Sequence, residues 1–252
     1  MLKRSSPDQR CVTLERAIEM ASRGGWLSSQ PESFVRRFLK DATTRFYDAG
    51  KTLFEHGDPV LDMLCLVEGM LEIYIEHPQI GFALFHFGQP GIWFGEQRVY
   101  GLDRRRITVR AKLPSTVLSI PARSLDRMIE DDPMTLKSFG LLSDMNLAWC
   151  MKVVGETLQS NSLVRVSVRL VTLAVARSAG GRKERVDLAI NQDELATLCN
   201  LSRKTLNRAL GMLREAGVVR TNYGTVTIVN LEKLSEIASN AAHASAGGWK
   251  LT

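Results

Sequence analysis

The chain has 252 residues, of which 44% are apolar, so it can bury a core in one large domain or in two ordinary ones. Its net charge of +6 lies entirely in residues 161–252, which carry 13 basic and 7 acidic side chains and so suggest an anionic partner. The sequence has no signal peptide, no apolar run of about 20 residues and no CxxC pair, which favours a soluble, cytoplasmic protein without a membrane span or a metal site.

The first half of the chain begins with short helical patterns and continues with strands. Apolar residues recur at helical spacing in residues 12–40. From Gly50 to Pro121, glycines separate short runs with strand character, and Leu71, Ile73 and Ile75 alternate with polar residues. Many short strands at regular spacing predict a compact sandwich or barrel.

A long helix is predicted from about Pro133 to about Gln159. One apolar stripe runs along it at gaps of three and four: Phe139, Leu142, Met145, Trp149 and Val153. Such a stripe could pack on the sandwich of its own chain or pair with its twin in a second subunit. We interpret it as the interface of a homodimer, followed by a hinge at residues 159–162 and a further helix over residues 164–176.

Two short helices joined by a tight turn follow in residues 191–213. Asn191 is expected to cap the first helix in a capping box with Glu194, and Asn200 to end it in the left-handed conformation. Ser202 is expected to cap the second helix, whose outer face is basic and polar. This is the helix-turn-helix pattern, and the second helix suits the major groove of DNA.

A β-hairpin wing is predicted next, with a turn at Asn222, Tyr223 and Gly224. Arginine can pair with guanine and asparagine with adenine, while lysine and serine can hold phosphate. The predicted DNA contacts are Gln192, Ser202, Arg203, Lys204, Thr205, Asn207, Arg208, Arg220 and Tyr223.

The order of these parts resembles the family of bacterial regulators typified by catabolite activator protein and the fumarate–nitrate reductase regulator. The resemblance rests on "GKTLFEHGDPVLDMLCLVEGMLEIY", on Phe94-Gly95-Glu96 and on "DELATLCNLSRKTLNRALGMLREAGVV". It implies an α+β fold with a cyclic-nucleotide-binding-like β-roll, a long dimerisation helix and a winged helix-turn-helix. It also implies a transcription regulator, not an enzyme, with double-stranded DNA carrying inverted-repeat sites, RNA polymerase and a second copy of the chain as partners.

The helix-turn-helix matches this family more closely than the β-roll does. Ser202, Arg203, Thr205 and Arg208 match the family's contacts, whereas Lys204 stands where the catabolite activator branch has a glutamate. The effector positions implied by the resemblance are Glu96, Arg105, Arg106 and Cys150. Arg98, Arg106, Cys150 and Met151 replace small or hydrogen-bonding groups of the cyclic AMP site, so we predict that this is not a standard cyclic AMP site.

Five parts are expected along the chain: an N-terminal helical segment (1–29), the β-roll (30–132), the dimerisation helix (133–160), the winged helix-turn-helix (161–240) and a flexible tail (241–252). No cofactor is required by the sequence. Two alternatives stay open: a cyclic AMP-dependent regulator of the same family, and a cupin-like metal enzyme, although the His-x-His motif of a cupin is missing.

Overall fold

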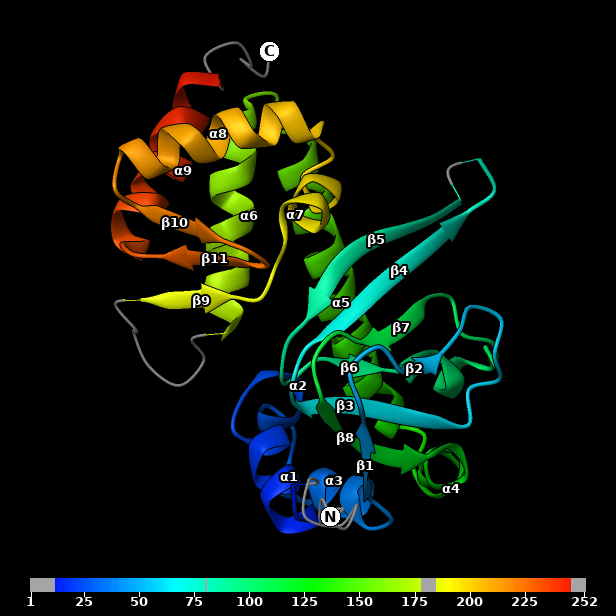
Figure 1. Ribbon diagram of the computed structural model, residues 1–252. Helices are drawn as coiled ribbons and strands as arrows, with labels where there is room; N and C mark the ends of the chain where they lie inside the picture. Colours follow the sequence, from blue (N-terminus) through cyan, green and yellow to red (C-terminus); the bar gives the residue numbers. More distant parts are fainter. Residues whose placement is uncertain (1–11, 80, 178–184, 246–252) are drawn as a thin grey trace, which may run out of the picture. The chain divides into compact units, whose positions relative to one another are not determined.

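The computed structural model describes residues 12–79, 81–177 and 185–245 (Figure 1). Its contacts gather into two compact units, Met1–Ala148 and Trp149–Thr252, here called the N-terminal unit and the C-terminal unit. The division differs from the five parts expected, because the N-terminal helices share a core with the β-roll and the long helix contributes to both units.

Three helices open the N-terminal unit: α1 (Leu14–Ser22), α2 (Gly25–Ser28) and α3 (Glu32–Leu39). The hydroxyl of Thr13 accepts a hydrogen bond from the backbone N–H of Arg16 and so caps α1. Ala17, Ala21, Phe34 and Phe38 recur on the buried faces of α1 and α3, as their helical spacing predicts. The described residues of this segment thus form helices that are part of a larger core.

Two antiparallel four-stranded sheets follow, as the alternation and the glycine-rich turns predict (Figure 1). The first has the strand order β1-β8-β3-β6, with β1 Thr43–Tyr47, β8 Ser115–Pro121, β3 Asp62–Glu68 and β6 Trp93–Phe94. The second has the order β2-β7-β4-β5, with β2 Thr52–Phe54, β7 Thr108–Ala111, β4 Leu71–His77 and β5 Gly81–Gly88. After β6 comes the short 3-10 helix η2 (Glu96–Tyr100), and after β8 come α4 (Ala122–Asp131) and α5 (Thr135–Leu158).

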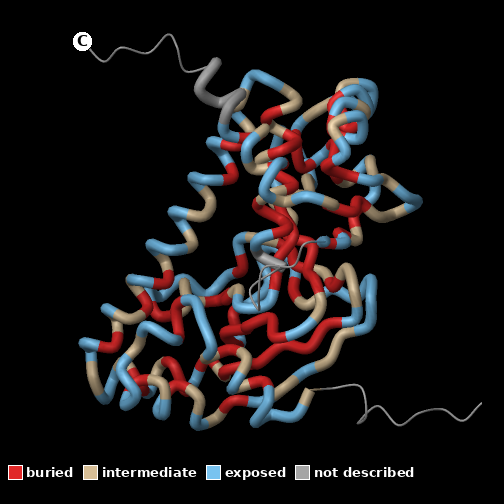
Figure 2. The backbone as a smooth tube through the Cα atoms, turned by 90° about the vertical axis from the view of Figure 1, so that its left-hand side faces the viewer, coloured by how far each residue is buried: buried red, intermediate tan, exposed pale blue. Residues whose placement is uncertain are grey.

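Strand β3 explains how the two sheets and the helices form one body. Successive side chains of a strand point to opposite faces of its sheet. Met63, Cys65 and Val67 join a core cluster with α1, α2 and α3, whereas Leu64 and Leu66 join a second cluster that includes residues of β4 and β7. Both faces of β3 are thus covered, and for this reason residues 63–67 form a continuous apolar run that is buried throughout. Figure 2 shows where buried residues lie along the chain.

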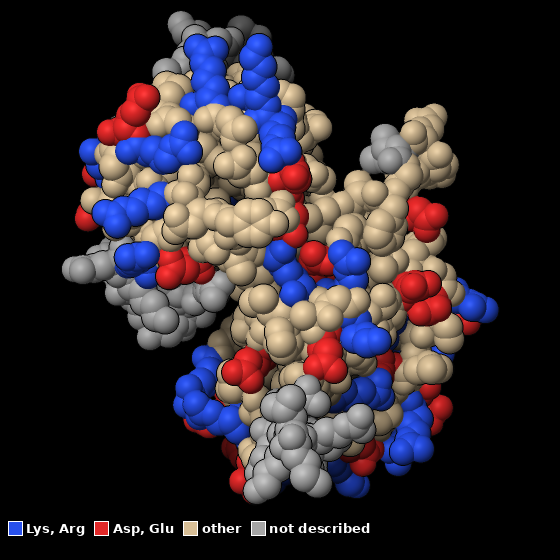
Figure 3. All heavy atoms as spheres, in the orientation of Figure 1, with Lys and Arg blue, Asp and Glu red and all other residues tan. Residues whose placement is uncertain are grey.

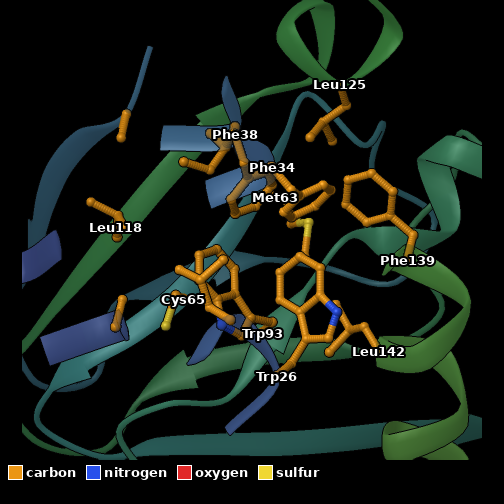
Figure 4. Close-up of a cluster of buried hydrophobic side chains, with 14 of the residues drawn as sticks. Trp26, Phe34, Phe38, Met63, Cys65, Trp93, Leu118, Leu125, Phe139 and Leu142 are labelled. Atoms are coloured by element: carbon orange, nitrogen blue, oxygen red, sulfur yellow. The ribbon is translucent and has the colours of Figure 1, made fainter. Parts of the chain in front are cut away.

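An aromatic cluster lies at the centre of the first core (Figure 4). Trp26 packs within 5.7 Å, between ring centroids, of Phe34, Phe38, Trp93 and Phe139. Its indole N–H also donates to the carbonyl oxygen of Ser138 over 2.6 Å. Because Ser138 and Phe139 belong to α5, this cluster fixes the first half of α5 to the N-terminal unit.

The C-terminal unit contains α6 (Ser162–Arg177), the helices α7 (Gln192–Leu198) and α8 (Arg203–Glu215), and α9 (Leu231–Ser245). A three-stranded antiparallel sheet has the order β10-β11-β9, with β10 Val219–Asn222, β11 Thr225–Ile228 and β9 Val186–Leu188. The hairpin of β10 and β11 is the wing predicted from the sequence, whereas β9 was not predicted. Since α9 continues to Ser245, the flexible tail does not begin at residue 241, and residues 246–252 lie outside the described part.

Candidate functional site

The turn between α7 and α8 has the local structure that the sequence predicts. The side chain of Asn191 accepts from the N–H of Glu194, and the Glu194 carboxylate accepts from the N–H of Asn191, both over 2.9 Å. This capping box starts α7. Asn200 has a φ of 48°, the only positive value among the described residues other than glycine, and it turns the chain towards α8.

Helix α8 presents one face to its own unit and one to solvent. The hydroxyl of Ser202 accepts from the N–H of Thr205 over 3.2 Å and caps the helix. Leu206, Ala209, Leu210 and Leu213 are buried. Spacings of one, three and four bring the exposed donors onto the opposite face: Arg203, Lys204, Asn207 and Arg208. Lysine and arginine side chains gather over this part of the molecule in Figure 3.

Three of the predicted DNA contacts also bind within the chain. Arg203 pairs with Asp193 of α7 over 3.3 Å, and both side chains are about two-thirds exposed. Such an exposed pair contributes about 0–1 kcal/mol, so DNA can replace it at little cost. Thr205 is half-buried, and its hydroxyl lies 2.9 Å from that of Ser202. Gln192 is half-buried at the first position of α7.

The wing is attached to α8 by a side-chain contact. Arg214, near the C-terminal end of α8, donates to the hydroxyl of Thr221 in β10 over 3.0 Å. Arg220 is exposed on β10, and Tyr223 is fully exposed in the turn before β11. Both residues thus lie on the wing with side chains that an external partner can reach.

In the N-terminal unit, Glu96 begins η2 and binds the long helix. Its carboxylate accepts a hydrogen bond from the side-chain amide of Asn146 in α5 over 2.8 Å. The effector position that the family resemblance implies on this helix is Cys150, four residues later, and Asn146 is not among the predicted residues. The signal that could have found Asn146 is its position, a polar residue on the same side of α5 as the buried Phe139 and Leu142.

Arg105 is buried and already has a carboxylate partner. Its side chain is 3% exposed, and Nη2 donates to the carboxylate of Asp62 over 2.7 Å and to the carbonyl of Asp62 over 2.8 Å. The guanidinium lies 4.1 Å from the ring centre of Phe54. Burial lowers the pKa of Arg105, and the charge of Asp62 opposes that shift. Its Nε and Nη1 have no hydrogen-bond partner among the described residues.

The remaining sensor residues differ in their burial and in their partners. Arg98 forms two hydrogen bonds to the carboxylate of Asp126 in α4, over 2.8 and 3.2 Å. Arg106 is exposed, unlike its buried neighbour Arg105. Cys150 is half-buried on the part of α5 that belongs to the C-terminal unit. The structure thus brings Glu96 and Arg105 close to each other, but Arg106 does not join them in the interior.

The predicted dimer stripe on α5 needs correction. Phe139 and Leu142 lie in the core of the N-terminal unit, and Val153 is also buried, so these three are covered within the chain itself. Trp149 is half-buried, and of the five predicted residues Met145 alone is exposed. Elsewhere on its surface, α5 carries a second apolar set that the sequence analysis did not single out: Leu141, Leu147, Met151, Val154 and Leu158, each more than half exposed.

Within residues 12–79, 81–177 and 185–245, no group of three or more His, Cys, Asp or Glu is arranged to hold a metal ion. None of the helices in these ranges has both the length and the apolar character needed to cross a membrane. Cys65 and Cys199 are buried, as expected of core cysteines, and burial raises the pKa of the Cys199 thiol to about 12.

These features define a two-part regulator with a β-roll and a winged helix-turn-helix. A family model for the cyclic nucleotide-binding domain matches residues 44–132, and one for the Crp-like helix-turn-helix domain matches residues 164–237. The chain belongs to the family of transcription regulators typified by catabolite activator protein and the fumarate–nitrate reductase regulator.

Relatives of known function and a solved structure agree with this assignment. The chain is 24% identical over 227 residues to the CRP-like cAMP-activated global transcriptional regulator of Mycobacterium tuberculosis, covering 87% of this chain and 99% of the relative. It is 23% identical over 175 residues to the transcriptional regulator SdrP of Thermus thermophilus, covering 69% and 83%. A putative cyclic nucleotide binding protein from Ruegeria pomeroyi has the same fold, with a TM-score of 0.67, 20% identity and coverage of 90% and 99%. The chain is therefore a DNA-binding transcription regulator.

Proposed function

We propose that this regulator binds inverted-repeat DNA as a homodimer and reads each half-site with the outer face of α8. The observation that carries the proposal is the exposed row of Arg203, Lys204, Asn207 and Arg208 at the start of a capped helix. The N-terminal residues of a recognition helix are the ones that contact base edges in the major groove. A dimer places two such helices in successive grooves about 34 Å apart, so that the site is an inverted repeat.

The hydrogen-bonding groups of the side chains indicate which part of the DNA each one contacts. Arg203 and Arg208 are suited to bidentate contact with guanine, worth roughly 1–3 kcal/mol of discrimination per base pair. Lys204 has no acceptor atom, so it contacts a phosphate or a guanine or thymine edge and not the amino group of cytosine. Ser202 and Thr205 hold phosphate, while Arg220 and Tyr223 of the wing contact the DNA backbone. Because its partner is DNA, we place the protein in the bacterial cytoplasm, with RNA polymerase as a further partner.

The second copy of the chain covers the exposed apolar face of α5. Leu147 and Val154 lie seven residues apart, as do Met151 and Leu158. Apolar residues at this spacing suit two helices that wind around each other in a left-handed coil. All four side chains are more than half exposed within one chain. Exposing this apolar surface to water costs free energy, which burial against a second copy would remove.

The effector side of the proposal follows from Asp62. Because this carboxylate pairs with Arg105 inside the β-roll, as well as with the half-exposed Arg45, the buried guanidinium has a counter-charge without an anionic ligand. We therefore propose that DNA binding does not require cyclic AMP. A cyclic nucleotide-dependent regulator remains the second candidate, since Glu96 lies close to Arg105 and two nitrogens of that arginine have no partner among the described residues.

Selection from a random DNA pool tests the reading of DNA. The wild-type protein is expected to select an inverted repeat, and Arg208→Ala to lose preference at one position in each half-site. Arg220→Ala should instead keep the selected motif, weaken binding to all sequences and lower the salt dependence by about one phosphate contact. An Arg208→Ala protein that selects the unchanged wild-type motif would mean that α8 does not read the sequence.

A further inference from the structure

Two arginines of α6 bind the turn of the helix-turn-helix motif. Arg165 and Arg169 lie four residues apart and so share one face of the helix. Nη2 of Arg169 donates to the carbonyl of Leu198 over 3.1 Å. Nη1 of Arg165 donates to the carbonyls of Cys199 and Asn200, both over 3.2 Å. The two arginines therefore hold three successive carbonyl groups, which end α7 and form the turn before α8.

The same two arginines also hold the last turn of α5. Arg169 pairs with the carboxylate of Glu156 over 3.1 Å, and the side chains are 2% and 5% exposed. Nε of Arg165 donates to the carbonyl of Gln159, the residue that follows α5, over 2.7 Å, and its Nη2 binds the same oxygen. Each arginine thus joins the end of α5 to the turn of the motif through one planar group.

A third residue of α6 completes the buried pair. The hydroxyl of Thr172 donates to the second oxygen of the Glu156 carboxylate over 2.6 Å. Two buried charges with defined hydrogen bonds are not the cheapest way to fill this space, because apolar side chains of similar volume are often at least as stable. The charged groups instead fix the geometry of the contact, because the planar guanidinium group binds its partners in only a few arrangements.

The turn that these arginines hold determines where α8 begins. The last carbonyls of a helix have no partner within it, and here the arginines supply partners for those of α7. Asn200 is followed after one residue by Ser202, which caps α8. A displacement of Leu198, Cys199 and Asn200 would therefore move the end of α8 that carries Arg203, Lys204, Asn207 and Arg208.

We propose that Arg165 and Arg169 are positioning residues, through which the last turn of α5 sets the orientation of α8 for DNA reading without either arginine touching DNA. The proposal rests on the proposed function of α8. It assigns to α6 a role in sequence discrimination, beyond that of a scaffold. It also means that a shift of the end of α5 against α6 breaks the bonds that hold the turn.

The test is Arg165→Lys, which keeps the positive charge but removes the planar fork. The ammonium group of lysine cannot bind the carbonyl of Gln159 and those of Cys199 and Asn200 in the same geometry. We expect affinity for the selected inverted repeat to fall about tenfold, the effect of losing charge-assisted hydrogen bonds. Affinity for a scrambled duplex of equal length should fall by less than about threefold, since phosphate contacts supply non-specific binding. Both are measured by fluorescence anisotropy over a range of salt.

Lys233→Met is the matched control. The ammonium group of Lys233 also donates to a carbonyl at a helix end, that of Ala216 after α8, over 3.0 Å. This contact lies at the C-terminal end of α8, away from the turn. The variant should keep the wild-type ratio of specific to non-specific affinity. Thr172→Val provides a second test variant, because it removes one hydrogen bond to Glu156 and changes the volume little, and we expect a ratio about threefold lower.

The outcomes separate this proposal from the proposed function. If Arg165→Lys and Thr172→Val keep the wild-type ratio, the arginines do not position α8. If Arg165→Lys weakens binding to both duplexes equally, Arg165 acts on non-specific binding and not on sequence discrimination, and the proposal is also wrong. If the wild-type protein itself prefers no duplex from the pool, the proposed reading of DNA has failed instead. Circular dichroism melting checks that each variant is folded.

Discussion

Gly95 and Arg105 show how tightly the residues around the buried charge are packed. Gly95 has a φ of 102°, and a Cβ atom added there would lie 2.6 Å from the carbonyl oxygen of Asp62 and 2.8 Å from Nη1 of Arg105. Only glycine fits both the left-handed backbone and this close approach. The backbone can thus lie this close to the guanidinium group only because residue 95 is glycine. This close packing keeps Arg105 beside Asp62.

We expect Gly95→Ala to destabilise the protein more than Gly101→Ala does. The two glycines flank η2, and both have positive φ, but a Cβ at Gly101 would meet nothing within 4 Å. Gly101→Ala should therefore cost only the backbone strain, about 1–2 kcal/mol. Gly95→Ala should cost several kcal/mol, because backbone and a buried arginine must also move. Urea denaturation of both variants checks the difference, and equal midpoints would contradict the close packing described for Gly95.

At the scale of elements, α5 carries one set of apolar side chains that is buried within the chain and another that is exposed. Phe139 and Leu142 pack into the core of the N-terminal unit, while Leu147, Met151, Val154 and Leu158 are exposed elsewhere on the helix. A periodicity of three and four residues shows that a helix has an apolar face, but it does not tell which of two faces is covered by the same chain. For this reason the sequence did not show that Phe139, Leu142 and Val153 are buried within the chain itself.

Leu147→Glu should convert the proposed dimer into monomers, because it places a charge in the seam between two copies of α5. Leu61→Glu is the control: Leu61 is also strongly exposed, at 71% against 59% for Leu147, but it lies before β3. Sedimentation velocity should show a monomer for the first variant and the wild-type species for the second. A Leu147→Glu protein that sediments like the wild type would show that this face is not the interface.

Phe139 is expected to behave differently from Leu147. It has no exposed surface and contacts three aromatic rings of α2 and α3. Phe139→Ala should therefore lower the free energy of unfolding by about 3–5 kcal/mol, as for other buried aromatic residues. Guanidinium denaturation followed by circular dichroism measures this loss. A stability equal to that of the wild type would contradict the placement of Phe139 in the core.

For the whole molecule, the distribution of charge sets what each unit can bind. The excess of positive charge lies in residues 161–252, where α8 and the wing carry exposed basic residues. In the N-terminal unit, by contrast, two arginines have carboxylate partners: Arg105, a predicted effector residue, pairs with Asp62, and Arg98 pairs with Asp126. The basic side chains of α8 and the wing are thus accessible to an anionic partner, whereas these arginines of the β-roll already bind carboxylates of their own chain.

Calorimetric titration with cyclic AMP should show no tight binding, and DNA affinity should be the same with and without the nucleotide. The reason is that a cyclic phosphate would have to compete with Asp62 for a guanidinium already paired within the β-roll. Fluorescence anisotropy with the selected duplex provides the second measurement. Saturable micromolar binding that raises DNA affinity would establish the second candidate, and Glu96→Gln and Arg105→Lys would then be the variants to compare.

Most elements could be predicted from the sequence because their signals are local. The caps at Asn191 and Ser202 and the left-handed turn at Asn200 depend on residues within a few positions of each other. The pairs Glu96 with Asn146, Arg105 with Asp62 and Arg165 with Cys199 join residues 34 or more positions apart. No spacing rule along the chain connects such residues. The fold was therefore largely predictable, while the partners of the sensor arginines and the supports of the turn were not.

The buried pair of Glu156 and Arg169 has a consequence for the exchange of domains between relatives. The residue that neutralises Arg169 lies on α5, before the hinge at which the sequence suggests a joint. A chimaera that takes residues 1–160 from another family member would also replace Glu156, and a donor without a carboxylate there would leave Arg169 buried without its counter-charge, at a cost of about 3–5 kcal/mol. If the two sequences are joined before Glu156, both residues of this pair come from the same protein. The segment that must be transferred as a unit with the helix-turn-helix therefore begins inside α5 and not after it.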